Sequence, residues 1–418
     1  MSLVVQKFGG TSVADADRIR AVAEHVVRTR DEGHRVVVVV SAMGKTTDDL
    51  LRLAHEVSPS PPGRELDMLQ TAGERIAMAL LCIATWDRGV PSASFTGSQA
   101  GIVTDSAHGR AKILEVRADR LREALDAGQV VVVAGFQGVS RGRDITTLGR
   151  GGSDTTAVAL AAAMGADACE IYTDVAGIYS ADPRVVPRAR LLRQVSYQEM
   201  LEMAATGGRV LALRSVEFAR NHDVPLHVRS SFTWEPGTRV TKEEGPKEAG
   251  PEEEGMEQAI ISAVTHDVSE AKITVERVPD RPGIAARLFR ALADEAVNVD
   301  MIEQNVSVHG ATDISYTVPL ADLPTALKVT EAMAAEIGAD RVTHDAEIAR
   351  VSLVGAGMKT HPGVAAAMFE ALADAGINIE MISTSSIRIS CVVRSADVEG
   401  GVRALHSAFG LDLPDEPG

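Results

Sequence analysis

Two glycine-rich turns hold the residues best suited to chemistry. The first follows a short apolar run, Leu3–Phe8, in which Lys7 precedes the pair Gly9 and Gly10. A strand that leads through such a turn into a helix directs free N–H groups and the positive end of the helix dipole at one point, which suits a phosphate. Lys7 adds a full positive charge there. Without the two glycines, a solvent-exposed lysine at a strand end would be the default interpretation.

The second turn, LGRGGSDTTA (Leu148–Ala157), repeats this arrangement before another predicted helix. Arg150 can hold a carboxylate through two parallel hydrogen bonds, and Asp154 can receive an ammonium group or position a metal-bound phosphate. Ser153 as a helix cap explains the serine and the aspartate, but not an arginine among three glycines. Phosphoryl transfer needs cations and N–H groups on the phosphates and a correctly aimed acceptor, so the two turns together predict that reaction class.

Three further segments offer polar side chains for ligands. SAMGKTT places hydroxyl groups directly after a buried strand, although Thr46 or Thr47 could instead cap the following helix. Glu74 and Arg75 are adjacent in an apolar helical stretch, so one of them points towards the core or a site, unless the two form a solvated ion pair. Residues 172–184 combine acidic, aromatic and basic side chains that would suit a nucleoside, with an ordinary loop as the alternative.

The elements that position these residues follow from the apolar pattern. Up to residue 232, β-branched apolar runs alternate with helical stretches, which predicts an α/β fold with a mainly parallel sheet between helices. Ligands of such sheets bind at the carboxyl ends of the strands, where both glycine turns and Ser41 fall. The predicted strands are Leu3–Phe8, Arg35–Val40, Val130–Gly135, Glu170–Val175 and Pro225–Ser230.

An acidic linker separates this region from an internal repeat. Residues 241–258 contain seven glutamates, two lysines and two prolines, a composition that cannot bury a core. Beyond it, Pro282–Ile302 and Pro362–Ile382 are identical at twelve of twenty-one positions, at a constant offset of 80. Each copy reads as a strand, a Pro-Gly turn, an amphipathic helix and a second strand. The copies are either plain packing units or paired regulatory β-α-β modules that bind an amino acid, and the turn at each helix start favours the second interpretation.

Composition excludes several classes of protein. A net charge of −16 over 418 residues argues against a nucleic-acid surface. Cys82, Cys169 and Cys391 have no ligand-like spacing and read as buried thiols of a reducing compartment, and the eleven histidines form no metal pattern. No early apolar segment reaches the length of a signal peptide or membrane span, so we expect a cytoplasmic protein without a membrane partner.

The motifs KFGGTS, SAMG, TAGERI, SFTGSQAGI, GFQGV, GRGGSDTTA and YTDVAGIYSADPR, taken in order, resemble the aspartate kinases. This family belongs to the amino-acid kinase superfamily and carries tandem ACT domains, and the likeness is strongest to its actinobacterial members. The resemblance implies a catalytic domain over 1–240, the linker over 241–258, and two ferredoxin-like ACT regions over 259–345 and 346–418. It also implies ATP- and Mg²⁺-dependent phosphorylation of the L-aspartate side-chain carboxylate to 4-phospho-L-aspartate, the first step towards lysine, threonine, methionine and diaminopimelate.

The resemblance further implies a role for individual residues. Lys7 would counter charge on the transferred phosphoryl group, Asp154 would lie where phosphate and acceptor meet, Arg150 would take the α-carboxylate of aspartate, and Glu74 would meet its amino group. Residues implied at ATP are Lys7, Gly9, Gly10, Ser41, Thr173, Asp174, Tyr179, Arg184 and Arg209, and those implied at aspartate are Thr47, Glu74, Arg150, Gly151, Gly152 and Ser153. No fixed metal site is implied.

Several positions depart from the family pattern. Relatives usually carry lysine where Arg209 stands, and arginine and lysine are not interchangeable on phosphate. In the repeats, Ile284 and Ser386 replace glutamates and Ala365 replaces a threonine. Lysine and threonine are the effectors that the family implies, and losing two carboxylates and a hydroxyl predicts altered or lost feedback. The implied effector residues are Asp280, Gly283, Ala285, Asn298, Asp300, Gln304, Asn378, Ile379, Ser385 and Ser386.

Assembly and rival functions follow from the same features. Paired ACT domains predict a homo-oligomer, or an α2β2 assembly with a shorter chain started internally at about Met256, where the EEEG run requires purine-rich codons that resemble a ribosome-binding site. Chance would also produce such a run in a glutamate-rich linker. A kinase for glutamate or a nucleotide is the nearest rival enzyme. A catalytically silent amino-acid sensor is the rival from another class.

Overall fold

The computed structural model describes residues 2–242, 260–305, 310–356, 358, 361 and 363–412. Contacts divide them into two units, each described separately below. The first comprises residues up to Ile178, Leu191–Ala204 and 209–242. The second comprises Tyr179–Arg190, Ala205–Gly208 and the described residues from 260 onwards. A single boundary at residue 240 therefore misses two short segments that belong with the second unit.

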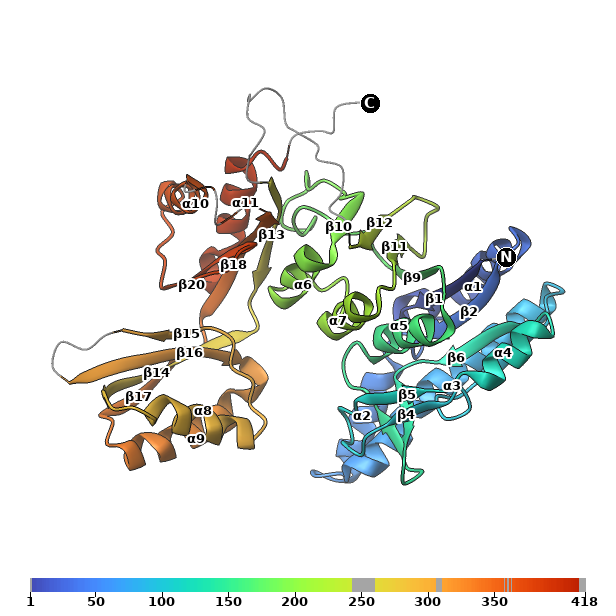
Figure 1. Ribbon diagram of the computed structural model, residues 1–418, viewed down its shortest axis with the longest axis horizontal. Helices are drawn as coiled ribbons and strands as arrows, with labels where there is room; N and C mark the ends of the chain where they lie inside the picture. The colour runs from blue at the N-terminus through green and yellow to red at the C-terminus, as the bar shows by residue number, and fades with distance from the viewer. Residues whose placement is uncertain are drawn as a thin grey trace. The chain divides into compact units, whose positions relative to one another are not determined.

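The first unit contains an eight-stranded sheet with the order β10-β12-β11-β9-β1-β2-β6-β3. Its neighbours pair in parallel except β11 and β12, which confirms the predicted mainly parallel sheet (Figure 1). The strands are β1 (Leu3–Phe8), β2 (Arg35–Val40), β3 (Ser92–Phe95), β6 (Val130–Ala134), β9 (Ala168–Thr173), β10 (Gln194–Ser196), β11 (Leu226–Ser230) and β12 (Thr238–Thr241).

Helices cover both faces of this sheet because its central strands are apolar on both sides. Val36, Val38 and Val40 pack with Ile19 of α1 (Ala16–Asp31) and Leu81 of α3 (Gly63–Asp87). Alternate residues of a strand point to opposite faces. Val39 accordingly faces the other side, where α5 (Gly152–Met164) packs on β1, β2 and β9 and against α7 (Leu213–His222).

A smaller four-stranded sheet, with the order β5-β4-β7-β8, completes the first unit. The sequence analysis did not predict it, because each of its strands is only three or four residues long. They are β4 (Ile102–Thr104), β5 (Ile113–Val116), β7 (Gln137–Ser140) and β8 (Ile145–Thr147). The remaining elements are the 3₁₀ turn η1 (Gly10–Val13) and the helices α2 (Thr46–Val57), α4 (Asp119–Asp126) and α6 (Tyr197–Ala205).

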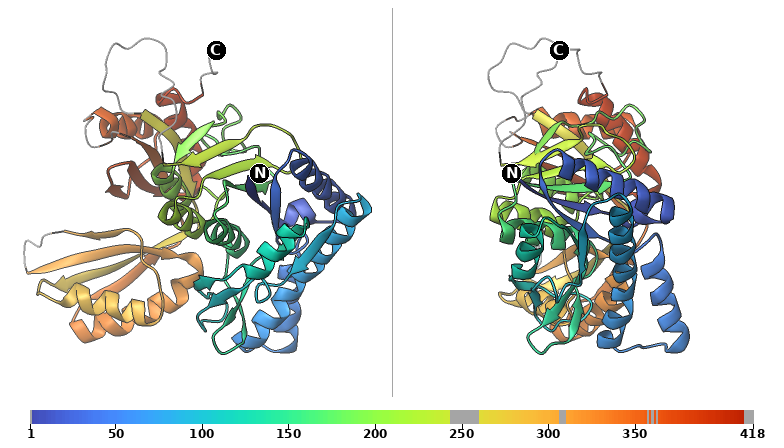
Figure 2. Two further views of the ribbon diagram at one scale, coloured as in Figure 1. Left: turned by 45° about the vertical axis from the view of Figure 1, so that its right-hand side comes forward. Right: turned by 90° about the vertical axis from the view of Figure 1, so that its right-hand side faces the viewer.

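The second unit contains two antiparallel four-stranded sheets, one for each repeat copy. The first has the order β15-β16-β14-β17 and the second β13-β18-β20-β19. Helices α8 and α9 lie side by side on the first, and α10 and α11 pair on the second (Figures 1 and 2). The strands are β13 (Ile260–Asp267), β14 (Glu270–Pro279), β15 (Ile302–Gln304), β16 (Ala311–Pro319), β17 (Arg341–Asp345), β18 (Ile348–Ala356), β19 (Met381–Thr384) and β20 (Arg388–Arg394). The helices are α8 (Ile284–Asp294), α9 (Leu323–Ile337), α10 (Gly363–Asp374) and α11 (Val398–Ala408), with 3₁₀ turns η2 (Leu320–Asp322) and η3 (Ser395–Asp397).

The two sheets differ in the origin of one edge strand. β17 follows the first copy and pairs antiparallel with β14. At the corresponding edge of the second sheet, β18 pairs with β13, which precedes the first copy. The region 259–345 therefore does not form a self-contained domain, since its first strand, β13, completes the sheet of the second repeat copy.

Part of the catalytic-region sequence is built into the second unit. Ala181, Val185 and Val186 share a hydrophobic core with Val264 of β13 and Leu405 of α11. The backbone N–H of Val264 donates to Ser180 O at 2.7 Å. Burial of these side chains explains why residues 179–190 cluster there.

The cysteines and the lengths of the helices bear on two further expectations. Cys82, Cys169 and Cys391 are free and buried, as predicted. Among the described residues, no helix has both the length and the apolar character needed to cross a membrane. Met256 lies outside the described residues.

Candidate active site

Lys7 and Asp154 form an ion pair at the carboxyl end of β1. Phe8 packs on the α1 and α3 side of the sheet. The preceding residue on the strand, Lys7, must face the opposite side, where Asp154 lies in the first turn of α5. Lys7 Nζ is 2.6 Å from Asp154 Oδ1, and the two side chains are 12% and 11% exposed. An ammonium group with three donors and one close carboxylate retains capacity for an anionic ligand.

The KFGG turn packs tightly on the loop after β2. The Ser41 N–H donates to Phe8 O at 3.1 Å, and the Gly44 N–H donates to Gly10 O at 3.0 Å. A Cβ on Gly10 would lie 2.9 Å from Ala42 O, so that close approach requires glycine. A Cβ on Gly9 would lie 3.5 Å from Lys7 Nζ, in the space beside the ammonium group. These contacts bring the predicted phosphate residues together.

Glu74 is buried beneath the same loop. Its Oε1 accepts the Ala42 N–H at 3.2 Å, whereas its buried Oε2 has no hydrogen-bond partner among the described residues. Burial raises the pKa of Glu74 to about 7, although the Ala42 N–H opposes the shift. A Cβ on Gly73 would lie 2.6 Å from the Ala42 Cβ, which shows how closely α3 approaches the loop. The prediction that Glu74 or Arg75 points inward is confirmed for Glu74, which is 3% exposed.

The GRGGSD turn connects β8 to α5. Gly149 and Gly151 have φ values of +78° and +71°, which glycine adopts without strain. Arg150 lies exposed between them. Gly151 occupies the N-cap position without a side-chain cap, so the alternative role of Ser153 as the cap is not observed. Ser153 is buried, and a Cβ on Gly135 would lie 2.7 Å from its Oγ.

The threonines that follow β2 do not cap α2 either. Lys45 occupies the N-cap position and makes no side-chain cap bond. Thr46 Oγ1 donates to Met43 O at 2.6 Å, while Thr47 lies half-buried in the first turn. The hydroxyl of Thr47 is therefore not engaged as a cap.

The predicted nucleotide residues fall into two groups. At the end of β9, Thr173 Oγ1 donates to Asp174 Oδ1 at 3.1 Å, and Thr173 O accepts the Ser231 N–H at 2.8 Å. Sequence analysis missed Ser231, whose Oγ is 2.5 Å from that of Ser12. The other group is dispersed: Arg209 is exposed in the first unit.

Tyr179 and Arg184 belong to the second unit. Arg184 pairs there with Asp182 at 2.6 Å and holds the pKa of that carboxyl below its usual range. The fold of the first unit thus brings together, through connected contacts, the residues Lys7, Gly9, Gly10, Ser41, Glu74, Ser153 and Asp154.

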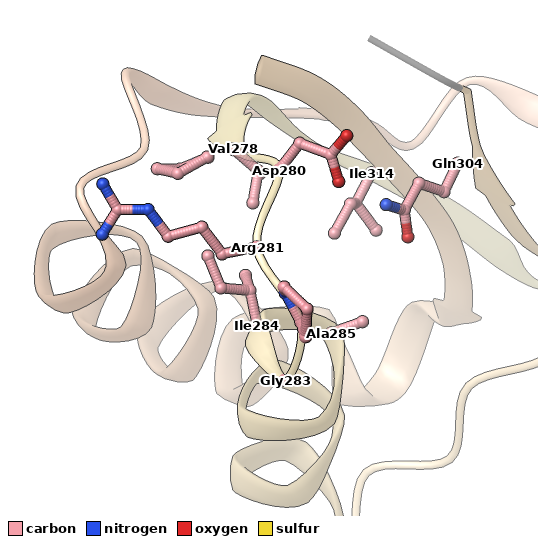
Figure 3. A pocket seen from close by; sticks show the side chains of 10 residues that line it. Val278, Asp280, Arg281, Gly283, Ile284, Ala285, Gln304 and Ile314 are labelled. Carbon is pink, nitrogen blue, oxygen red and sulfur yellow. The ribbon is translucent and has the colours of Figure 1, made fainter. Parts of the chain in front are cut away.

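The first Pro-Gly turn of the repeat lines a pocket of about 300 Å³. Gln304 of β15 and Ile314 of β16 face the Asp280–Ala285 turn, and the Arg281 guanidinium points away from Gln304 (Figure 3). Four predicted effector residues line this pocket: Asp280, Gly283, Ala285 and Gln304. Ile284, the position that departs from the family pattern, lines it too.

The other predicted effector residues lie elsewhere in the second unit. Asp300 pairs with Arg350, and Asn298 and Asn378 are exposed. Ile379 packs against the core of the second copy. Ser385 and Ser386 lie in the turn between β19 and β20, where Ser385 Oγ accepts the Ile387 N–H at 3.3 Å. No cluster of metal-ligating side chains occurs in the described ranges.

Comparison with known proteins identifies the family. The profile of the amino acid kinase family matches residues 2–230, and that of the ACT domain matches 261–332 and 351–409. The chain is 58% identical to the aspartokinase of Mycolicibacterium smegmatis, covering 100% of this chain and 98% of the relative. It is 53% identical to that of Corynebacterium glutamicum, with coverage of 100% and 98%.

Solved structures agree with this relationship. The chain resembles E. coli aspartokinase III in complex with aspartate and ADP, with a TM-score of 0.82, 27% identity, and coverage of 97% of this chain and 99% of that one. It is 46% identical to the aspartate kinase of Synechocystis, with a TM-score of 0.54 and coverage of 100% and 71%. The chain belongs to the aspartokinases, phosphotransferases of the amino acid kinase family that use ATP to phosphorylate the carboxylate of aspartate.

Proposed function

We propose that Lys7 and Asp154 form the center at which the γ-phosphoryl group meets the aspartate side chain. The 2.6 Å ion pair between them carries this assignment. Phosphoryl transfer depends mainly on positioning and on cations placed where negative charge gathers. Lys7 supplies that charge beside the glycines Gly9 and Gly10, and Asp154 holds the ammonium group in place before the nucleotide binds.

Aspartate occupies the side of the site formed by the GRGGSD turn and Glu74. The exposed Arg150 guanidinium takes the α-carboxylate bidentately. Glu74 receives the amino group, because a buried carboxylate with one oxygen lacking a partner is a strong acceptor for an ammonium ion. Thr47, Gly151, Gly152 and Ser153 complete this side.

ATP lies along the ends of β1 and β9. Gly9, Gly10 and Ser41 contact its phosphates, and Thr173 and Asp174 line the nucleoside, together with Arg209. The complex of E. coli aspartokinase III with aspartate and ADP supports the same ligand classes here. Mg²⁺ would be held by Asp154 and the bound phosphates, since this ion binds through one or two carboxylates plus phosphate oxygens. When bound, it neutralises charge on the β- and γ-phosphates.

Initial-rate measurements with aspartate test the assignment. ADP release is measured in parallel reactions that all contain ATP, with aspartate, glutamate or a nucleotide as the acceptor. We expect turnover with aspartate alone, and Arg150→Lys should raise the KM for aspartate about tenfold without changing that for ATP. Equal turnover with glutamate would favour the rival kinase, and absence of aspartate-dependent ADP release would favour the silent sensor.

We also propose weakened feedback. Ile284 lines the pocket at the first Pro-Gly turn, and the resemblance to the family implies glutamate at this position and at Ser386. E. coli aspartokinase III has been solved with lysine and aspartate, which supports an amino acid as the effector class. Ile284→Glu with Ser386→Glu should restore inhibition by lysine plus threonine. Strong inhibition of the unaltered enzyme at low effector concentration would reject the proposal.

Assembly and cellular location complete the proposal. The chain forms a homo-oligomer or an α2β2 assembly through its ACT regions, with the shorter chain started near Met256, and it works in the cytoplasm. Its catalytic region and two ACT regions follow the predicted boundaries at 240, 258 and 345, except that residues 179–190 and 205–208 cluster with the second unit and β13 completes the second ACT sheet. Three buried free thiols support a reducing compartment. Expression of the gene tests the internal start: a second polypeptide recognised by antibodies to the ACT region supports it, and a single product rejects it.

A further inference from the structure

Behind the GRGGSD turn, one buried carboxylate joins three separate elements. Asp67 of α3 is 1% exposed. Its Oδ1 accepts from Thr147 Oγ1 at 2.6 Å and from the Gly109 N–H at 3.0 Å, and its Oδ2 lies 2.6 Å from His108 Nδ1. An ionised carboxylate only accepts hydrogen bonds, so all three neighbours direct donors at it. Asp67 thus fixes the end of β8 and the loop between β4 and β5 to α3.

That arrangement continues directly into the turn that carries Arg150. Thr147 is the last residue of β8, and its carbonyl oxygen accepts the Ala111 N–H at 2.9 Å. A Cβ on Gly149 would lie 2.9 Å from Gly109 O, so the turn rests against the loop that Asp67 holds. Two residues after Leu148, Arg150 stands exposed at the apex.

A second side chain, on α7, also binds both the turn after β8 and the loop between β4 and β5. Arg214 donates through Nη1 to Leu148 O and through Nη2 to Ala111 O, both at 2.9 Å. Burial lowers the pKa of the Arg214 guanidinium. The planar fork of an arginine sets the separation of the two carbonyls it bridges. The start of the turn, at Leu148, and the neighbouring loop, at Ala111, are thereby held before substrate arrives.

We infer that Asp67, through Thr147 and Gly109, is a positioning residue for aspartate: it preorients the Leu148–Gly151 turn and so aims Arg150. This inference rests on the proposed role of Arg150 at the α-carboxylate. Precise placement of a binding group lowers the cost of ordering it on association. Loss of the constraint therefore weakens aspartate binding and leaves ATP binding unchanged.

Matched variants of Thr147 test the inference. Thr147→Val keeps the shape of the side chain and removes its hydroxyl, whereas Thr147→Ser keeps the hydroxyl. We expect Thr147→Val and Asp67→Asn to raise the KM for aspartate about tenfold, with the KM for ATP within about twofold and Thr147→Ser close to the unaltered enzyme. Thermal melting of each full-length variant identifies the fraction that remains folded at the assay temperature.

Arg150→Lys in the same panel separates the two hypotheses. If Arg150→Lys raises the KM for aspartate and Thr147→Val does not, the positioning role is rejected while the substrate assignment stands. If Arg150→Lys leaves that KM unchanged, the assignment of Arg150 fails. A fall in melting temperature with both KM values unchanged makes Asp67 a structural anchor only and also rejects the inference.

Discussion

Each unit contains a cation that is mostly shielded from water and paired with at least one carboxylate, and the two cations differ in how many acceptors engage them. Lys7 meets Asp154 at the end of a strand, beside Gly9, whose missing Cβ leaves the space next to the ammonium group unfilled. Arg350, 1% exposed, pairs with Glu270 at 2.8 Å and with Asp300, and donates to Ala205 O at 2.9 Å. Its partners come from three separate segments of the second unit.

The difference separates a reactive group from a structural one. A compact ammonium with one acceptor can exchange water for phosphate, whereas a guanidinium with three fixed acceptors cannot leave them without a large cost. Burial raises the pKa of Glu270 despite the nearby Arg350, because both side chains are almost fully shielded from water. Burial of a charged pair alone therefore does not identify a catalytic site.

The largest expected effect comes from removing the reactive cation. Lys7→Met should lower turnover about 1,000-fold, because the phosphoryl group loses its positive neighbour during transfer. The measurement is the rate of aspartate-dependent ADP release at saturating substrates. Lys7→Arg is the control, and it should recover only part of the rate because its fork differs in shape from an ammonium. A rate for Lys7→Met within tenfold of the unaltered enzyme would contradict the catalytic role.

The corresponding change in the second unit should act on stability. Arg350→Leu leaves Glu270 buried without its cation and should cost about 3–5 kcal/mol in the free energy of unfolding. Urea denaturation of the full chain measures it. Arg394→Leu is the matched control: Arg394 is 49% exposed in its pair with Asp345, so its loss should lower the free energy of unfolding much less. Equal losses in the free energy of unfolding for the two variants would contradict the structural role of Arg350.

Glu74 offers a pH test within the first unit. Its pKa is raised to about 7, so between pH 4.5 and 7 the folded chain binds more protons than the unfolded chain. The contribution of Glu74 to stability is therefore favourable at low pH and is lost as pH rises through this window. Because the ionised form receives the substrate ammonium group, the KM for aspartate should also fall from pH 6 to pH 8.

Glu74→Gln is the control for both effects. The amide does not titrate, so the variant should show a flatter dependence of melting temperature on pH over that range. Its KM for aspartate should be raised and should not change between pH 6 and pH 8. A KM that falls equally in both proteins would assign the titration to another group.

The smallest expected effect concerns the exposed cation that departs from the family pattern. Arg209→Lys restores the usual lysine and should change the KM for ATP by about threefold or less, because an exposed charge contributes little. Turnover at saturating ATP should stay constant. A tenfold change in KM would place Arg209 directly on the phosphates.

The sequence predicted most of the turns and strands that depend on neighbouring residues. It predicted few of the contacts between residues that are far apart in the chain. Local glycines and apolar runs are enough to predict the KFGG and GRGGSD turns and the strands before them. Asp67 does not, because it lies 41 residues from His108 and 80 from Thr147, and only the fold brings them together. The same limit hid the contact between Ser12 and Ser231.

The alternative interpretation of Ser153 and of Thr46 or Thr47 as helix caps is not observed, for a local reason. Gly151 and Lys45 occupy the cap positions without side-chain bonds. Glycine in the left-handed region turns the chain into α5 by itself, which leaves the serine available. Patterns of residue type show where a helix begins within a residue or two, and the backbone conformation decides which residue caps it.

β13 and residues 181–186 each pack with elements that lie far from them in the sequence. This limits where the chain can be cut to build a chimera with another kinase. Grafting the regulatory half onto another kinase at the acidic linker would carry β13 along but leave behind Ala181, Val185 and Val186, which fill its core. A cut between the two repeats would remove the edge strand of the second sheet. The sequence segments that build the regulatory core and the catalytic region therefore overlap. A working chimera must take residues 181–186 and β13 from the same parent chain.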